Sequence, residues 1–441
     1  MISKSNNSVK KHLMLLAVLL FTIGSTGYAT NGYFRHAYGT QYSGLAGAGV
    51  ALYISPFASA TNPAAIAFMG KMLDVEFSFF NPNREYTVTG NPSGFPGTFP
   101  LTPGNVDSDS KLFVIPGLAF SIPLSGGNAI GLAIFGNGGM NTNYDTKTFN
   151  DPRLTFDVPT GVDLSQLFVA GTFAKKFGEH HSIGVTGVFA FQRFKAEGLF
   201  AFGGFSSDPT KLTNNGHATS TGFGARFGYL GEFGVLSIGG SYQTKISMSE
   251  FDEYAGLFAE SGDFDIPSNW TAGVAIKATP ALTLVADIQQ IMYSDIAAIN
   301  NPLNLQEISP VLPDGSPNPG FKPLGSDGGS GFGWDDMTVF KAGVQLEAAP
   351  GLMLRGGFST GSQPIAESEV LFNILAPGVV EQHVTLGLTK ALNEKLSINV
   401  GLMHAFSHDV TGPNPFEAPN QQQIEIKMNQ FEGDIGLSIA L

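Results

Sequence analysis

Two basic residues on one predicted strand, Arg193 and Lys195, are the best candidates in this chain for binding an anionic group. A carboxylate held away from bulk water needs a cation or several hydrogen-bond donors. Both residues share a face of the strand with Phe189, Phe191 and Glu197. The alternative is a structural ion pair with Glu197 or another acid. Other basic residues at comparable strand positions, which would serve equally well, are Lys277, Lys341 and Arg355.

The sequence contains no recognisable catalytic set. It has no Gly-x-Ser-x-Gly elbow and no phosphate-binding loop with its lysine, and no Ser or Thr nucleophile stands near a His on adjacent predicted strands. His404 and His408 have the spacing of a helical zinc pair, but at the end of a predicted strand they would be about 13 Å apart. We therefore expect neither an enzyme nor a metal or other cofactor.

Alternation of apolar and polar residues predicts fourteen strands after residue 70. Residues 73–80 alternate in this way, and residues 270–278 and 338–347 repeat the pattern. One face of such a strand suits hydrocarbon and the other suits a polar interior. Because charges do not belong on a lipid-facing surface, we expect the face that carries Arg193 and Lys195 to point into the interior.

The connections between these predicted strands alternate between long and short. An antiparallel barrel in an outer membrane has long outer loops and tight periplasmic turns, and its sheet must close because open edges cannot face lipid. Residues 71–441 are therefore predicted to form an all-β fold, a single transmembrane antiparallel barrel of about fourteen strands. The long connections are residues 81–110, 137–165, 197–221, 247–267, 294–336, 361–379 and 407–423, and the short ones are 123–128, 178–181, 232–234, 279–280, 349–351 and 392–394.

The N-terminal 29 residues have the pattern of a signal peptide. An apolar run at residues 13–23 follows Lys10 and Lys11, and small residues precede a predicted cut after Ala29. The chain contains no cysteine, which suits passage through an oxidising periplasm, and its net charge of −13 argues against a nucleic-acid partner. We expect a monomer in the bacterial outer membrane, in contact with membrane lipid and lipopolysaccharide.

Residues 30–70 do not read as barrel strands. They are rich in Gly and Ala, and they contain Asn62, Pro63 and Ala64 just before the first strand. A fourteen-stranded barrel has a lumen wider than side chains alone can fill. We therefore predict that these residues form an N-terminal hatch that plugs the lumen. The alternative is a loose periplasmic tail.

A series of short motifs runs along the whole mature chain. They are TNGYF at 30–34, YSGLAGAG at 42–49, NPA at 62–64, MSEF at 248–251, YAGLFA at 254–259, DIP at 265–267, YSD at 293–295 and LAPGVVEQH at 375–383. With these motifs in this order, the chain resembles the FadL-type outer-membrane transporters of long-chain fatty acids and other hydrophobic compounds.

The resemblance implies a fourteen-stranded barrel whose hatch is closed by the Asn62-Pro63-Ala64 motif. It also implies transport of long-chain fatty acids or similar compounds by passive, hatch-gated diffusion, with capture on the outer loops and lateral release into the membrane. Three alternatives stay open: a hydrocarbon importer of the same fold, an open general porin and an adhesin-like barrel.

Aromatic residues in two long outer loops are candidates for the capture groove. In the fourth long loop they occur at helical spacing and form one apolar face. The alternative is that they merely pack the two loops together. The candidate groove residues are Phe200, Phe202, Phe251, Tyr254, Leu257 and Phe258.

Two glycine-containing breaks in the predicted strands are candidates for a side opening. Residues 116–117 interrupt the second strand, and residues 136–139 follow the third. Glycine within a strand often marks a bulge where the ladder is interrupted. Such a break is a candidate position for an opening in the wall, and the alternative is that these glycines simply allow the strands to pack.

Overall fold

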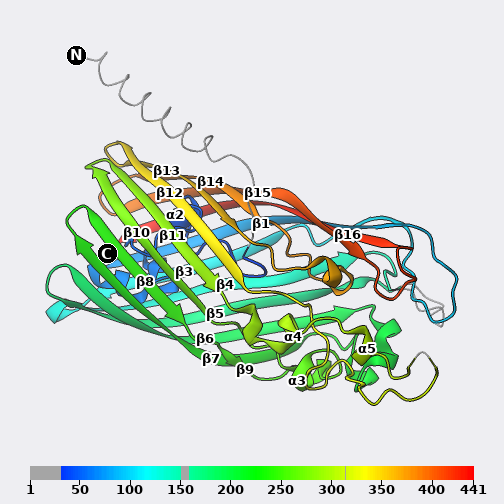
Figure 1. Ribbon diagram of the computed structural model, residues 1–441. Coiled ribbons are helices and arrows are strands. Elements are labelled where there is room, and N and C mark those ends of the chain that lie inside the picture. Colours follow the sequence, from blue (N-terminus) through cyan, green and yellow to red (C-terminus); the bar gives the residue numbers. More distant parts are fainter. Residues whose placement is uncertain (1–30, 150–157, 313) are drawn as a thin grey trace, which may run out of the picture.

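The computed structural model describes residues 31–149, 158–312 and 314–441. Within these residues, fourteen antiparallel strands form one closed barrel, in which the last strand pairs with the first (Figure 1). The predicted all-β barrel is therefore confirmed. The predicted signal peptide and its cleavage site lie outside the described residues.

The strands follow one another around the barrel in chain order. Two further short strands, β2 (Gly104–Asp107) and β9 (Ser247–Met248), pair only with β1 and β7. The barrel strands are β1 (Met72–Thr89), β3 (Phe113–Pro123), β4 (Asn128–Tyr144), β5 (Thr160–Phe177), β6 (His181–Glu197), β7 (Ala218–Phe233), β8 (Leu236–Gln243), β10 (Asn269–Thr279), β11 (Leu282–Ile291), β12 (Met337–Ala349), β13 (Leu352–Gly361), β14 (Gln382–Ala391), β15 (Leu396–Pro413) and β16 (Gln423–Ala440).

The described helices are all short, and none has the length and apolar character needed to cross a membrane. They lie in the N-terminal segment, in one tight turn and in the long loops. They are α2 (Thr40–Ser43), η1 (Pro56–Ala60), η2 (Pro63–Phe68), η3 (Ser125–Gly127), η4 (Phe200–Phe205), η5 (Pro209–Lys211), η6 (Asp252–Tyr254), α3 (Ala259–Gly262), η7 (Tyr293–Asp295), α4 (Ala297–Asn300), α5 (Leu305–Ile308), η8 (Glu367–Glu369) and α6 (Val370–Asn373).

Tight turns gather at one end of the barrel and long loops at the other, as the sequence predicts (Figure 1). Several strands run further than predicted, into the predicted loops. Two examples are β1, which continues to Thr89, and β15, which continues to Pro413. Each of these strands has 18 residues, whereas about 9–11 tilted residues cross a bilayer. Their outer ends therefore stand above the hydrocarbon.

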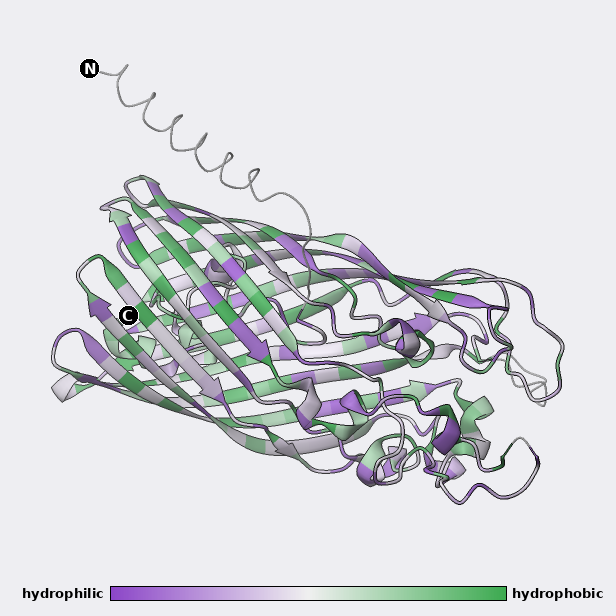
Figure 2. Cartoon of the chain, in the orientation of Figure 1, coloured by the Kyte–Doolittle hydropathy of each residue, from purple (hydrophilic) through white to green (hydrophobic). Residues whose placement is uncertain are grey.

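Side chains alternate between the two faces of the wall. On β1, Phe77 and Phe79 are exposed on the outer face, whereas Asp74, Glu76 and Ser78 are buried on the lumenal face. Figure 2 shows the same alternation of hydrophobic and hydrophilic residues along the other strands. The predicted division into an apolar outer face and a polar inner face is thus confirmed.

The N-terminal segment, residues 31–70, lies inside the barrel and touches widely separated strands of its wall. Gln41 donates a hydrogen bond to Ser438 of β16 (3.0 Å), and the amide of Gly49 donates to Asp287 of β11 (2.7 Å). On another side, the hydroxyl of Ser182 on β6 donates to the carbonyl of Ala64 (2.9 Å). Because these strands lie around the circumference, the segment crosses the lumen. Its role as a gate stays a prediction.

Strand glycines allow the segment to lie directly on the wall. A Cβ at Gly184 of β6 would lie 2.4 Å from the carbonyl carbon of Pro63, and one at Gly228 of β7 would lie 2.1 Å from Oδ1 of Asn62. No side chain fits at these distances. The wall thus has two bare positions where the Asn-Pro-Ala motif docks.

Candidate functional site

The Asn-Pro-Ala motif joins the N-terminal segment to the wall through the buried side chain of Asn62. Its Oδ1 accepts a hydrogen bond from the amide of Ala64 (3.1 Å), which caps η2, and Pro63 takes the first position of that helix. Its Nδ2 donates to the carbonyls of Val50 (2.7 Å) and Tyr229 (2.9 Å). One amide side chain thus ties η2, the preceding loop and β7 together.

A buried charge cluster joins the same segment to β1 and β16. The guanidinium of Arg35 contacts Glu432 at 2.9 Å and both Glu76 and Asp434 at 3.4 Å, and it also donates to the hydroxyl of Ser78. Three carboxylates therefore surround one cation. An isolated buried carboxylate is costly, so this cluster favours the position in which Arg35 stays in place.

The wall has a gap between β3 and β4. The β3–β4 ladder runs from Pro123↔Ala129 to Leu118↔Ile134 and then stops. Residues 113–117 of β3 still pair with β1. Beyond the gap, β5 is the one described strand that pairs with β4, with a bulge between Gly136 and Gly138. Both breaks expected from the sequence therefore border one gap. We call this gap the wall window.

The outer edge of the wall window is closed by the loop that precedes β3. The amide of Asp109 donates to the carbonyl of Asn143 (2.7 Å), and the amide of Asn143 donates to the hydroxyl of Ser108 (3.0 Å). These bonds join the loop to the outer end of β4. The window is thus bounded on all sides and is not an unravelled edge.

The free edge of β4 at the wall window is paired from inside by the N-terminal segment. The amide of Arg35 donates to the carbonyl of Asn137 (2.7 Å), and the amide of Gly139 donates to the carbonyl of Tyr33 (3.0 Å). Unpaired backbone groups within a membrane are costly. The N-terminal residues therefore supply the hydrogen bonds that β3 no longer provides.

A cavity of about 430 Å³ lies next to the window and reaches both sides of the wall. Its lining includes the lumenal side chains Met428 and Gln430 as well as the outer-face side chains Leu167, Phe191 and Val114. Such a volume is within the range of small-molecule sites. An apolar molecule in this cavity would have a sideways exit.

One basic residue that lines the cavity, Arg84, was not among the candidates predicted from the sequence. It is buried on the lumenal face of β1, and its Nη1 donates to the carbonyl of Ser110 (3.3 Å). Among the described residues no carboxylate forms an ion pair with it. The sequence placed residues 81–110 in a loop, although the alternation of β1 continues through Arg84 to Val88.

A second, smaller cavity of about 40 Å³ lies among the outer loops. Three of the six predicted groove residues, Phe202, Leu257 and Phe258, line it, together with Phe194 and Phe372. We call it the outer groove. The lining consists almost entirely of apolar side chains. It therefore provides few polar groups that could distinguish one apolar ligand from another.

Two other predicted groove residues, Phe251 and Tyr254, do not line the outer groove. Both are fully buried, with ring centroids 5.6 Å and 4.9 Å from that of Phe194. The hydroxyl of Tyr254 donates to the carbonyl of Gly216 (2.6 Å) and accepts from the amide of Ala196 (3.1 Å). They pack the loops together, which was the alternative interpretation. Phe200 is half-buried on η4 and lines neither cavity.

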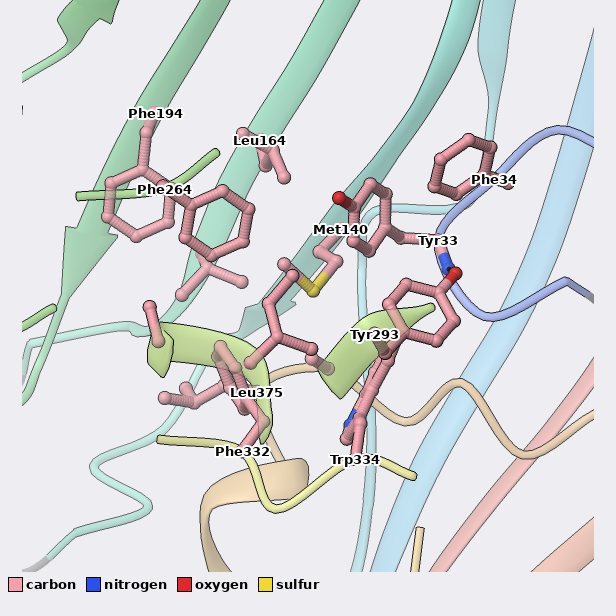
Figure 3. Packing of buried hydrophobic residues seen from close by; sticks show 14 of the residues in the cluster. Tyr33, Phe34, Met140, Leu164, Phe194, Phe264, Tyr293, Phe332, Trp334 and Leu375 are labelled. Carbon is pink, nitrogen blue, oxygen red and sulfur yellow. Dashed lines mark hydrogen bonds between the residues drawn. The ribbon is translucent and has the colours of Figure 1, made fainter. Parts of the chain in front are cut away.

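An aromatic cluster, which we call the aromatic partition, reaches from Tyr33 in the lining of the large cavity to Phe332 in the lining of the outer groove. Tyr33, Tyr293 and Trp334 converge there, with ring centroids 5.5 Å apart for Tyr33 and Tyr293 and 5.1 Å apart for Tyr293 and Trp334 (Figure 3). The two spaces are close, because Leu164 lines the large cavity and its cross-strand partner Phe194 lines the outer groove. Tyr33 belongs to the N-terminal segment, so movement of that segment would change the partition.

The predicted lumenal orientation of Arg193 and Lys195 is wrong. Both lie on the outer face of β6, where Arg193 pairs with Asp163 (3.1 Å) and Lys195 with Glu197 (2.8 Å). Arg193 follows the first residue of β6, His181, by 12 positions (193 − 181). At about 3.3 Å per residue and a tilt of about 45° it lies about 28 Å along the barrel axis, beyond an apolar band of about 25 Å.

A charged side chain is therefore tolerated on the outer face at this distance along the barrel axis. The aromatic residues that share a face with Arg193 indicated the orientation of that face more reliably than its charge did. Arg193 nevertheless lines the outer mouth of the large cavity. Two of the other three candidates, Lys341 and Arg355, are buried on the lumenal face as expected, whereas the third, Lys277, is exposed and lies 4.0 Å from Glu232. Nζ of Lys341 donates to the carbonyl of His36 (3.4 Å), and Arg355 donates to Gln345 and Thr389, both at 2.7 Å.

The loop between β8 and β10 carries an acid with a shifted pKa. Burial, together with the neighbouring Asp265, raises the pKa of Asp263 to about 7. Asp265 itself accepts a hydrogen bond from the amide of Met248 (2.7 Å) and pairs with Lys245 (2.7 Å). This loop supplies Leu257 and Phe258 of the outer groove, so its stability affects the groove.

Residues 23–432 match the model of a family described as outer membrane protein transport protein (OMPP1/FadL/TodX). No curated protein sequence matches the chain. The P. putida toluene transporter TodX has a similar structure, with 15% identity, a TM-score of 0.67, and coverage of 92% of this chain and 99% of that one.

Two further solved structures have the same fold. The Ralstonia pickettii toluene transporter TbuX has 16% identity and a TM-score of 0.60, covering 92% of this chain and 99% of that one. A Pseudomonas aeruginosa FadL homologue has 14% identity and a TM-score of 0.65, covering 93% of this chain and 99% of that one. At these identities the likeness shows the fold alone.

Proposed function

Because the chain belongs to the OMPP1/FadL/TodX family of outer membrane transport proteins, we propose that it carries hydrophobic compounds inward through the large cavity and the wall window. The chain is a protein of the outer membrane, and members of its family transport hydrophobic ligands. The family and the solved structures with this fold are transporters or channels, not enzymes.

The observation that carries the proposal is the wall window beside the cavity. A wet channel offers an apolar solute no favourable surface, whereas this cavity is walled by Phe, Met and Leu side chains and reaches the outer face of the wall. A solute there can leave sideways without crossing the N-terminal segment. An open general porin is disfavoured, because residues 31–70 occupy its path.

The proposed route has three steps. A solute first enters the outer groove, lined by Phe202, Leu257 and Phe258. It next passes the aromatic partition when Tyr33 moves with the N-terminal segment. It then occupies the large cavity and leaves through the wall window into the membrane. Diffusion down a gradient drives each step, and the segment held by Asn62 acts as the hatch.

Long-chain fatty acids are the substrate that we propose, with hydrocarbons as the second candidate. TodX and TbuX are described as toluene transporters, and the P. aeruginosa neighbour as a FadL homologue. The apolar lining of the outer groove suits both classes. A choice between them depends on the polar groups of the large cavity.

Closure of the wall window with a disulfide tests the route. A Cβ at Gly136 would lie 2.8 Å from Cγ2 of Ile115, which is close enough for a cysteine pair across the window. The chain has no native cysteine, so Ile115→Cys/Gly136→Cys creates the only pair. We would express it in cells that lack their own transporter and measure uptake of labelled oleate and labelled toluene.

Uptake by this double variant should be lost under oxidising conditions and restored by dithiothreitol. Uptake by the single variant Ile115→Cys should not change with the oxidant or with dithiothreitol. Mass spectrometry would verify the cross-link. Full uptake by the fully cross-linked protein would rule out the window as the route.

A further inference from the structure

Arg84 stands out among the buried arginines because its partners are few. Arg35 has three carboxylates, and Arg355 donates to two side-chain oxygens at 2.7 Å. Arg226 donates to the carbonyl of Ala60 and to Gln243. A guanidinium has five N–H donors, and for Arg84 the structure records one hydrogen bond, the 3.3 Å contact with the carbonyl of Ser110.

A buried cation without an anionic partner is costly, so its retention calls for an explanation. Arg84 lies on the lumenal face of β1, is only 6% exposed, and lines the large cavity. A molecule that enters the cavity thus meets a guanidinium most of whose N–H donors have no hydrogen-bond partner recorded among the described residues. Guanidinium groups bind carboxylates through paired, charge-assisted hydrogen bonds.

Within the cavity an anion is favoured at Arg84, because the carboxylates of the charge cluster lie around Arg35. The charged residues among its lining are Arg35, Arg84, Arg193 and Glu432. Glu432 is held by Arg35 at 2.9 Å, and Arg193 is paired with Asp163 at 3.1 Å. Arg84 is therefore the lining cation whose charge is not matched by a described carboxylate.

The position of Arg84 relative to the wall window fixes where a tail would lie. Arg84 contacts the loop whose residues close the outer edge of the window. Phe80, four residues earlier on the same face of β1, is about 13 Å away along the strand. Its ring centroid is 6.5 Å from that of Phe113 on β3, at the edge of the window.

We propose that Arg84 binds the carboxylate of an amphiphilic substrate, while the apolar tail lies along Phe80 and Phe113 and reaches the wall window first. This rests on the proposed function and names its substrate class as long-chain monocarboxylates. Uncharged hydrocarbons would use the same cavity without contacting Arg84.

Three labelled compounds test this assignment in the uptake assay: oleate, oleyl alcohol, which has the same tail without the charge, and toluene. The variants are Arg84→Met, which keeps the apolar stem, and Arg84→Lys, which keeps the charge. The control is Lys322→Met, which removes a cation of an outer loop that pairs with Glu307 and does not line the large cavity. Heat-modifiable migration in gels would confirm that each variant is folded in the outer membrane.

For Arg84→Met, oleate uptake should fall by about tenfold or more, since a hydrogen bond to a charged group is lost. Uptake of oleyl alcohol and toluene should stay within about twofold of the native level. Arg84→Lys should retain most oleate uptake, and Lys322→Met should resemble the native chain.

Several results would overturn the inference. These are unchanged oleate uptake in Arg84→Met, an equal fall for all three compounds in that variant when it is folded, an equal loss of oleate uptake in Lys322→Met, or a native chain that imports toluene and not oleate. Failure of the proposed function looks different, because the native chain would then import none of the three compounds.

Discussion

Removal of the Asn62 side chain should release the N-terminal segment from the barrel wall. Asn62→Ala removes the cap of η2 and two hydrogen bonds, to the carbonyls of Val50 and Tyr229. The cap contributes about 1 kcal/mol. Each of the other two bonds contributes about 1 kcal/mol net, and the site is too buried for water to replace them fully.

The sum is about 3 kcal/mol, which corresponds to about a 100-fold rise in the population with the segment undocked. Hydrogen exchange measures this population directly, because amides exchange through local opening. We expect amides in residues 50–68 to exchange about 100-fold faster in Asn62→Ala, with exchange in the barrel strands unchanged.

Asn304→Ala is the matched control. Asn304 also caps a helix, accepting from the amide of Gln306 at 3.0 Å, but it lies in an outer loop far along the chain. Its loss should leave exchange in residues 50–68 unaffected. If folded Asn62→Ala shows less than about a threefold change there, the motif does not hold the segment and the reasoning is wrong.

Three further predictions concern the window edge, the groove and its loop. Gly138→Ala places a methyl group 1.9 Å from the carbonyl oxygen of Tyr33, so it should push the N-terminal segment away from β4. The Gly139 amide, which donates to that carbonyl, should then exchange about tenfold faster in hydrogen-exchange mass spectrometry. Phe202→Ala should weaken oleate binding to cells by about tenfold, because it removes a wall of the outer groove. Burial raises the pKa of Asp263 to about 7, so its folded loop binds a proton more readily than the unfolded loop. The loop should lose stability as the pH rises from about 4 to about 7, and Asp263→Asn should remove this dependence in exchange measured across pH.

Each of these predictions has an outcome that contradicts it. Unchanged protection of Gly139 would mean that the segment adapts to the methyl group. For the groove, Phe200→Ala is the control because that side chain lines neither cavity, and equal losses in both variants would place capture elsewhere. If Asp263→Asn keeps the native pH dependence, another group controls the loop.

Much of the barrel was predictable because strand alternation is local. Successive side chains point to opposite faces wherever the backbone is extended, so the orientation of Glu76 and Phe77 follows from the run around them. The tight turns also have local causes, such as glycines at positive φ in Gly178 and Gly351. The Asn-Pro-Ala docking motif was identified through a family resemblance, and the structure supplies its contacts.

The errors have physical causes as well. Arg84 fell in the predicted loop 81–110, yet the pairing of β1 with β16 continues the strand through Asn81, Pro82 and Asn83, residue types that favour turns. Arg193 was assigned to the lumen because its charge was taken to exclude it from the outer face. Alternation shows which residues share a face, but it does not show their position along the barrel axis. Charge is excluded from the outer face only within the apolar band, and height depends on the tilt of the whole barrel.

The sequence by itself determined a closed fourteen-stranded barrel with long loops at one end, because strand periodicity and loop length are properties of short stretches of sequence. The tertiary structure alone decided where that wall is open and what lies behind the opening. The edge of β4 at Gly138 is completed by Tyr33 and Arg35, more than 100 positions earlier, and not by its neighbour β3. Such a pairing depends on the N-terminal segment lying inside the lumen, so no local pattern at either site records it.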